Sequence, residues 1–302
     1  KVVFRHRRMS KDVNTDAIRT VSCDFADNVD LVLPDFREGI ATWMSQRFGV
    51  SLDPYAEILP LMGSKEGIAK LPLAFVNPGD AAVIPDPGYQ AYQGGVILAG
   101  GEPHLVPLRS ENNYLIPLGG IPAEVRSRLR LMYLNYPNNP TTATAPLEYL
   151  EDAVNFCREH DALLVYDHAY SEIAFNGYRP PSILEVDGAD GVALEFHSFS
   201  KTYNMTGWRL GWVAGNAGLI ESLTKVKTFM DTGVFKAVQA AGAAALPARD
   251  RRRLRVGDRA GPQPPATRGR RGQAARRRRS RHACSRPRPV SLRPKPSVPS
   301  VM

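Results

Sequence analysis

The sequence of 302 residues predicts an α/β fold, with a mostly parallel sheet sandwiched by helices. Two observations indicate this class. Short runs rich in apolar residues alternate with longer runs of helical periodicity between residues 33 and 246. Several of the short runs are apolar throughout, which is typical of strands buried on both faces. Such alternation favours parallel strands that are joined by helical crossovers.

The predicted elements begin after Gly63. A helix is expected at 64–76, because Gly63-Ser64 can open it and the residues at 77–79, Asn-Pro-Gly, end it. A second helix is expected at 146–160, where proline lies near the first turn and apolar residues share one face. The remaining elements are strands at 81–85, 129–135, 162–166, 192–197 and 210–214, and helices at 89–99 and 217–230.

Charge and composition divide the chain into three segments. Residues 247–302 hold 17 Arg, one Lys and two acidic residues, a net charge of +16, while the other residues carry −7. This last segment has nine Pro and no aromatic residue, so we expect a disordered tail. Residues 33–246 are predicted to form one large domain, and residues 1–32 a divergent N-terminal segment.

The same features limit the partners and the location. A basic tail can bind nucleic acid or anionic surfaces, but no aromatic residue interleaves its arginines, and we expect no nucleic-acid partner. No run of about 18 apolar residues predicts a membrane span, and residues 1–10 lack the apolar stretch of a secretory signal. Three cysteines, far apart, form no metal-ligand spacing and suit a reducing cytoplasm.

A lysine among small hydroxyl residues gives the strongest chemical signal. Ser198, Ser200 and Lys201 follow the predicted strand at 192–197, and Arg209 comes eight positions after the lysine. A lysine there could form an imine with an aldehyde, while hydroxyl and guanidinium groups could hold a phosphate. Taken alone, such a segment is more often a solvated loop.

Asp167 ends a predicted buried strand, and Tyr170 follows three residues later. A buried carboxylate needs a cationic or hydrogen-bonding partner, and a protonated pyridine nitrogen would serve. A structural salt bridge or a turn cap is the alternative for Asp167 alone.

Three further features are weak by themselves. Gly63, Ser64 and Lys65 open a helix whose free N–H groups could bind a phosphate, or could simply be capped. Asn139 lies in a turn sequence after a strand. Tyr89 could stack on a flat ring or fill the core.

Together these residues resemble the fold-type I aminotransferases of class I/II, which depend on pyridoxal phosphate (PLP). The sequences of the motifs are most similar to those of the branch that contains LL-diaminopimelate and alanine aminotransferases. Five motifs carry the resemblance, in the family's order and spacing: G-S-K-E-G-I (63–68), P-D-P-G-Y (85–89), N-Y-P-N-N-P-T (135–141), Y-D-H-A-Y-S-E (166–172) and S-F-S-K-T-Y-N-M-T-G-W-R-L-G-W (198–212).

The resemblance implies roles for the matching residues. Lys201 would form the Schiff base with PLP and shuttle a proton, and Asp167 would pair with the pyridine nitrogen so that the ring acts as an electron sink. Tyr170 and Asn139 would hydrogen-bond the ring 3-oxygen, and Tyr89 would stack on the ring. The phosphate would be held at Gly63, Ser64, Lys65, Ser198, Ser200 and Arg209.

The implied reaction is a ping-pong transfer of an amino group between an α-amino acid and a 2-oxo acid, in a homodimer. A lyase or decarboxylase of the same fold remains an alternative, because the cofactor residues do not fix which bond breaks. So does an impaired fragment that keeps only cofactor binding.

Both ends depart from the family pattern. The resemblance stops near residue 246, so the small domain is predicted to be largely missing, and the arginine for the substrate carboxylate cannot be assigned. The glycine-containing segment that lines the substrate site is not found in residues 1–32. We interpret both ends as a coding sequence read out of frame or truncated.

Overall fold

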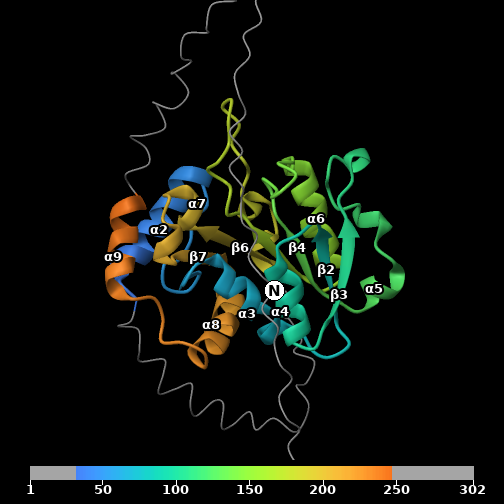
Figure 1. The fold of residues 1–302 in the computed structure, drawn as a ribbon, viewed down its shortest axis with the longest axis horizontal. Coiled ribbons are helices and arrows are strands. Elements are labelled where there is room, and N and C mark those ends of the chain that lie inside the picture. Colours follow the sequence, from blue (N-terminus) through green and yellow to red (C-terminus); the bar gives the residue numbers. More distant parts are fainter. Residues whose placement is uncertain (1–31, 247–302) are drawn as a thin grey trace, which may run out of the picture. The chain divides into compact units, whose positions relative to one another are not determined.

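A seven-stranded sheet organises the protein in a computed structural model, which describes residues 32–246 (Figure 1). The strand order is β1-β7-β6-β5-β4-β2-β3. Strand β7 pairs antiparallel with both neighbours, and the other adjacent pairs are parallel, which confirms the mostly parallel sheet. The strands are β1 (Ile58–Leu61), β2 (Ala81–Asp86), β3 (Glu102–Pro107), β4 (Leu129–Leu134), β5 (Leu163–Asp167), β6 (Ala193–Ser198) and β7 (Gly211–Gly215).

Helices cover both faces of this sheet. Apolar residues of α3 (Ser64–Phe75), α4 (Gln90–Leu98) and α8 (Ala217–Thr228) share one buried cluster with strand residues of one face. On the other face, α6 (Leu147–Glu159) packs over one half and α2 (Pro34–Phe48) over the other. Helix α9 (Lys236–Ala245) lies beside α2 (Figure 1), and α5 (Ala123–Ser127) and α7 (Phe199–Thr202) are short.

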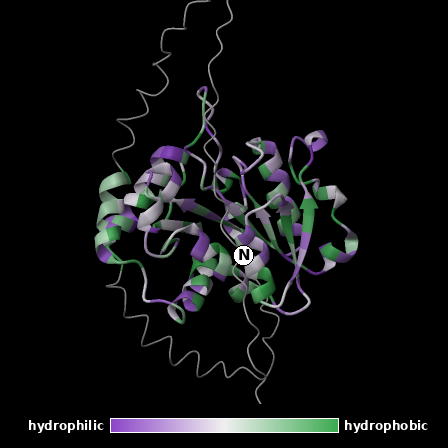
Figure 2. Ribbon diagram, in the orientation of Figure 1, coloured by the Kyte–Doolittle hydropathy of each residue, from purple (hydrophilic) through white to green (hydrophobic). Residues whose placement is uncertain are grey.

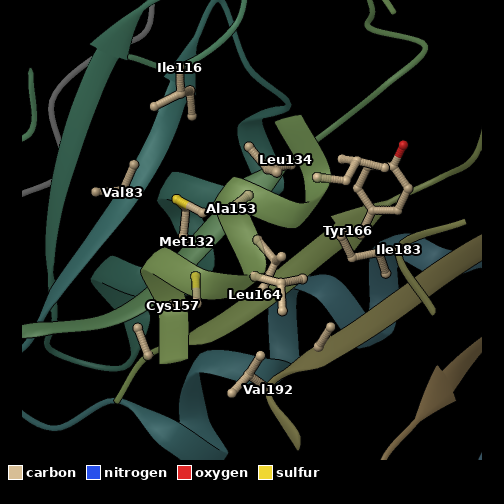
Figure 3. Close-up of a cluster of buried hydrophobic side chains, with 14 of the residues drawn as sticks. Val83, Ile116, Met132, Leu134, Ala153, Cys157, Leu164, Tyr166, Ile183 and Val192 are labelled. Carbon is tan, nitrogen blue, oxygen red and sulfur yellow. The ribbon is translucent and has the colours of Figure 1, made fainter. Parts of the chain in front are cut away.

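Alternation along the strands supplies both layers, because successive side chains of a strand point to opposite faces. Met132 of β4 and Leu164 of β5 point toward Cys157 of α6 (Figure 3). Their neighbours Leu131 and Val165 lie in the cluster beneath α3 and α4. The strands are therefore buried on both faces, as their continuous apolar sequence predicts.

The parallel strands β4, β5 and β6 end at the same edge of the sheet, where open α/β folds place their ligands. Hydrophilic colour marks the end of β6 in Figure 2. The residues that follow these three strand ends begin the site described below.

All nine elements predicted from the sequence are present, with ends displaced by at most two residues. Helices α2, α5, α7 and α9 and strands β1 and β3 are not among the predicted elements. Strand β3 contains Pro103 and Pro107 and lies at the edge of the sheet, the position at which prolines are tolerated.

The predicted tail at 247–302 and the divergent segment, apart from residue 32, lie outside the described residues. Within residues 32–246, no helix combines the length and the apolar character needed to cross a lipid bilayer.

Candidate active site

Asp167 is the last residue of β5, and its side chain is buried. Tyr92 of α4 donates a hydrogen bond of 2.7 Å to Oδ2, whereas Oδ1 has no hydrogen-bond partner among the described residues. Burial raises the pKa of Asp167 from 3.8 to about 6, although the Tyr92 hydroxyl and the backbone N–H of Ala169 oppose the change. A buried acceptor without a donor is costly, so Oδ1 indicates a place that a ligand N–H group would complete.

A chain of amide contacts leads from Asp167 to Tyr170. Asn135, which follows β4, donates from Nδ2 to the Asp167 carbonyl over 2.7 Å and accepts from the Asn139 N–H at its Oδ1 over 3.0 Å. The Asn139 Nδ2 then donates to the Tyr170 hydroxyl over 3.0 Å. The ends of β4 and β5 are thus joined, and the Tyr170 hydroxyl is fixed near both.

Two lysines face the aromatic residues of this edge. The Nζ of Lys201 lies 5.9 Å from the Tyr170 ring centroid, and the Nζ of Lys65 lies 5.5 Å from the Tyr89 ring centroid. The Tyr89 ring meets Tyr92 edge to face, with centroids 5.9 Å apart. No ion pair joins Lys201 to a carboxylate within residues 32–246, so its amine is available to a ligand.

The start of α3 forms a compact cradle with Arg209. Gly63 has φ of +84°, and a Cβ atom there would lie only 2.4 Å from the Arg209 Nη2. Gly211 at the start of β7 would likewise place a Cβ atom 2.7 Å from the Ser64 nitrogen. Two glycines therefore let a guanidinium group and the strand β7 approach the first amides of a helix, an arrangement suited to an anion.

Helix α7 completes this cradle from the end of β6. The Ser198 Oγ caps the helix by accepting from the Ser200 N–H over 3.2 Å. Thr206 connects α7 to the cradle, because its hydroxyl donates to the Ser200 carbonyl over 3.2 Å and its own carbonyl accepts from the Arg209 Nη1 over 3.0 Å.

The structure thus brings the sequence-predicted residues together in two adjoining groups. The chain itself connects them, since Ser64 precedes Lys65 and Ser200 precedes Lys201. The first is named the ring-facing group, after the Tyr89 and Tyr170 rings that its two lysines face. It consists of Lys65, Tyr89, Asn139, Asp167, Tyr170 and Lys201. The second, the cradle group, consists of Gly63, Ser64, Ser198, Ser200 and Arg209.

Sequence reasoning missed Tyr92 and Asn135, which hold Asp167 from two sides. Asn135 is the first residue of the motif at 135–141, but the motif alone does not indicate a role for its side chain. Tyr92 lies three residues after Tyr89, which is about one helical turn, and that spacing was the available signal.

Substitution of Gly63 by alanine tests the cradle. We expect Gly63→Ala to lower stability by about 1–3 kcal/mol, because φ of 84° with ψ of 148° is a backbone conformation that almost only glycine adopts, and also to weaken phosphate-ligand binding by displacing Arg209. Gly49→Ala is the matched control, because Gly49 has φ of +73° with no atom within 4 Å of the added Cβ. Urea unfolding and titration with inorganic phosphate separate the two effects. Equal phosphate affinity in both variants would contradict the cradle.

A family model described as "Aminotransferase class I and II" matches residues 24–277. The chain belongs to this family. It is 58% identical over 214 residues to an LL-diaminopimelate aminotransferase of Desulforudis audaxviator, which covers 71% of this chain and 55% of that protein. It is 52% identical over 212 residues to an LL-diaminopimelate aminotransferase of Aquifex aeolicus, which covers 70% of this chain and 55% of that protein.

Solved structures of aminotransferases share the fold. One from Staphylococcus aureus has a TM-score of 0.69 at 35% identity, with 78% of this chain and 63% of that chain covered. A probable N-succinyldiaminopimelate aminotransferase from Thermus thermophilus has a TM-score of 0.68 at 34% identity, with 78% and 64% covered. The chain spans about half the length of the curated relatives it matches.

The cofactor of this aminotransferase family is PLP, and the residues present fit it. The unpartnered Oδ1 of Asp167 is an acceptor suited to a pyridinium N–H group. The glycine-lined cradle beside Arg209 is suited to a phosphate. The amine of Lys201 lies 5.9 Å from the centroid of the Tyr170 ring, and Lys201 follows Ser200 of the cradle in α7.

Proposed function

We propose that this chain acts as a PLP-dependent aminotransferase, which transfers an amino group from an α-amino acid to a 2-oxo acid. The observation that carries the proposal is the buried, unpartnered Oδ1 of Asp167, at the same edge as an available lysine and an anion cradle. Membership of the family supports it.

When bound, PLP supplies an aldehyde that combines with amines and a ring that withdraws electrons from the attached carbon. In our proposal, Lys201 holds the cofactor through its Nζ, and Asp167 keeps the ring nitrogen protonated. A carboxylate is required for this, since a neutral acceptor would favour the proton far less.

The remaining residues orient the ring and the phosphate. Tyr170 and Asn139, already hydrogen-bonded to each other, are proposed to bind the ring 3-oxygen, and Tyr89 to stack on the ring. Phosphate binding is assigned to Arg209, the hydroxyl groups of Ser198 and Ser200, and the helix start at residues 63–65.

Lys201 has a second proposed role, as the base that removes a proton from the substrate α-carbon and returns it at another position. Its place on a four-residue helix directly after β6 lets the backbone fix its Cα while the long side chain moves. A flexible amine on a fixed point can serve both as the cofactor anchor and as a proton carrier.

LL-diaminopimelate is the amino donor to test first, because relatives at 58% and 52% identity bear that name. We also propose a homodimer located in the cytoplasm. Large apolar side chains at the α8–α9 connection support a covered surface there, with Phe229 and Phe235 57% and 75% exposed.

The amino-transfer half-reaction tests the function. Purified protein loaded with PLP is mixed with LL-diaminopimelate, and the cofactor absorbance is followed. We expect the cofactor band to change with donor concentration, and 2-oxoglutarate to restore it while glutamate accumulates.

Alanine and lysine are each tested in the same assay as alternative amino donors to LL-diaminopimelate. Release of CO2 or ammonia without glutamate would contradict transamination and favour a lyase or decarboxylase. Stable PLP binding without any change on addition of amino donors would instead indicate a chain that only binds the cofactor.

A further inference from the structure

Glu195 lies in the middle of β6, fully buried, on the face of the sheet that α2 covers. Its Oε1 is 3.1 Å from the His168 Nδ1 and 2.6 Å from the His197 Nε2. Its Oε2 accepts from the Ser182 hydroxyl over 2.5 Å and from the Ile183 N–H over 2.8 Å. Both carboxylate oxygens are therefore satisfied, and although burial opposes the charge, the two histidines hold the pKa of Glu195 well below its usual range.

This geometry fixes the proton positions on both imidazole rings. An ionised carboxylate only accepts hydrogen bonds, so His168 must carry a proton on Nδ1 and His197 must carry one on Nε2. The His168 Nε2 is buried without a partner among the described residues, and burial lowers the pKa of His168. The contact at Nδ1 and the unpartnered Nε2 favour the neutral Nδ1–H tautomer of His168.

The two histidines adjoin residues of the candidate active site. His168 follows Asp167 directly, and His197 directly precedes Ser198. Side chains that are neighbours along a strand point to opposite faces, so the histidines lie behind the site. The His197 ring is held by stacking on Trp212, with centroids 4.6 Å apart, and by the edge of Trp43.

We propose that Glu195, His168 and His197 form a positioning unit that locks the ends of β5 and β6 together, so that Asp167 and Ser198 meet the ring and the phosphate of one cofactor at the same time. This inference rests on the proposed function and extends it to residues that touch no ligand. The Glu195 carboxylate connects His168, which follows Asp167, to His197, which precedes Ser198.

The same three groups also resemble a metal site, because their ligand atoms lie within 4.8 Å of one another. A cation is not needed to explain them. The Ser182 hydroxyl and the Ile183 N–H already donate to Oε2, and the distances of 2.6 and 3.1 Å from Oε1 to the two ring nitrogens are those of hydrogen bonds. We therefore assign the cluster to positioning.

The test replaces each histidine by an amide side chain that either keeps or misplaces the nitrogen that donates to Glu195. The amide nitrogen of asparagine lies as many bonds from the backbone as Nδ1, and that of glutamine as many as Nε2. His168→Asn and His197→Gln therefore keep the donors to Glu195, whereas His168→Gln and His197→Asn misplace them. Glu185→Gln, which changes a nearby carboxylate in the capping box at Ser182, is the control.

We expect the two donor-keeping variants and the control to bind PLP within about threefold of the wild type. The two donor-misplacing variants should lose roughly tenfold or more, since small displacements of positioned groups have large effects. The loss should appear both with pyridoxal, which has no phosphate, and with inorganic phosphate, because the unit sets both halves of the site. Urea midpoints of the PLP-free proteins report any general loss of folding.

Nitrogen NMR of the PLP-free wild type gives an independent readout, with the Nδ1–H form expected for His168 and an Nε2–H for His197. Equal PLP affinities in all four histidine variants, or the opposite tautomers, would overturn the inference while leaving the proposed function intact. If a donor-misplacing variant does not fold, the inference is decided by the histidine tautomers of the wild type. A wild type that fails to bind PLP would overturn the proposed function, and this inference with it.

Discussion

Lys201→Ala is expected to abolish amino transfer, with a loss of about a thousandfold or more in the rate of the half-reaction with an amino acid. In the proposed mechanism the Lys201 Nζ both anchors PLP and moves the proton on the substrate carbon, so one truncation removes two functions. Absorbance of the loaded protein measures the anchor, and single-turnover mixing with LL-diaminopimelate measures the rate.

Lys225→Ala is the matched control for Lys201→Ala. Lys225 is half exposed on α8, where it pairs with Glu221 one helical turn away, and it lies outside the proposed site. Its removal should leave both measurements unchanged. Full amino transfer in Lys201→Ala would assign the anchor to another amine, such as that of Lys65, which lies 5.5 Å from the Tyr89 ring centroid.

The elements that the sequence predicted are those whose signals are local. Strand β5 is apolar throughout and ends in Asp167, and α3 begins at a glycine and ends before a proline. Strand β3 escaped prediction because it is half exposed and contains two prolines, so neither an apolar run nor an alternation marks it. Helix α9 consists largely of alanine and begins after Phe235 without a side-chain cap, so neither large apolar residues nor a capping residue marks its start.

The sequence motifs indicate candidate site residues but not how these residues are connected. Lys201, Asp167 and Arg209 stand in recognisable motifs, and the structure brings them to one edge of the sheet. The hydrogen bond from Tyr92 to Asp167 spans 75 positions of sequence. The carboxylate of Glu195 collects donors from three segments of the chain. The contacts of Glu195 with His168 and of Asp167 with Tyr92 join distant parts of the sequence, and they depend on how the crossovers fold back over the sheet.

Asp167→Asn is expected to reduce amino transfer by about a hundredfold or more while the overall fold is retained. The amide has the shape of the carboxylate and can still accept from the Tyr92 hydroxyl, so the geometry at Oδ2 persists. Its lack of negative charge removes the reason for the ring nitrogen to stay protonated. Single-turnover rates measure the loss, and a rate equal to that of the wild type would contradict the role of Asp167.

The same substitution should stabilise the PLP-free protein at neutral pH. The pKa of Asp167 is raised from 3.8 to about 6, so between these values the folded chain keeps a proton that the unfolded chain has lost. Wild-type stability therefore falls as the pH rises through this window, by about 3 kcal/mol in total. The variant does not titrate at this position. In urea titrations, the stability of the variant relative to the wild type should therefore be greater at pH 7 than at pH 4, by about 2 kcal/mol. If Asp167→Asn gains stability at pH 7 and loses amino transfer, the buried charge of Asp167 serves the chemistry at a cost in stability. An equal difference at both pH values would show that the Asp167 carboxyl does not carry this cost.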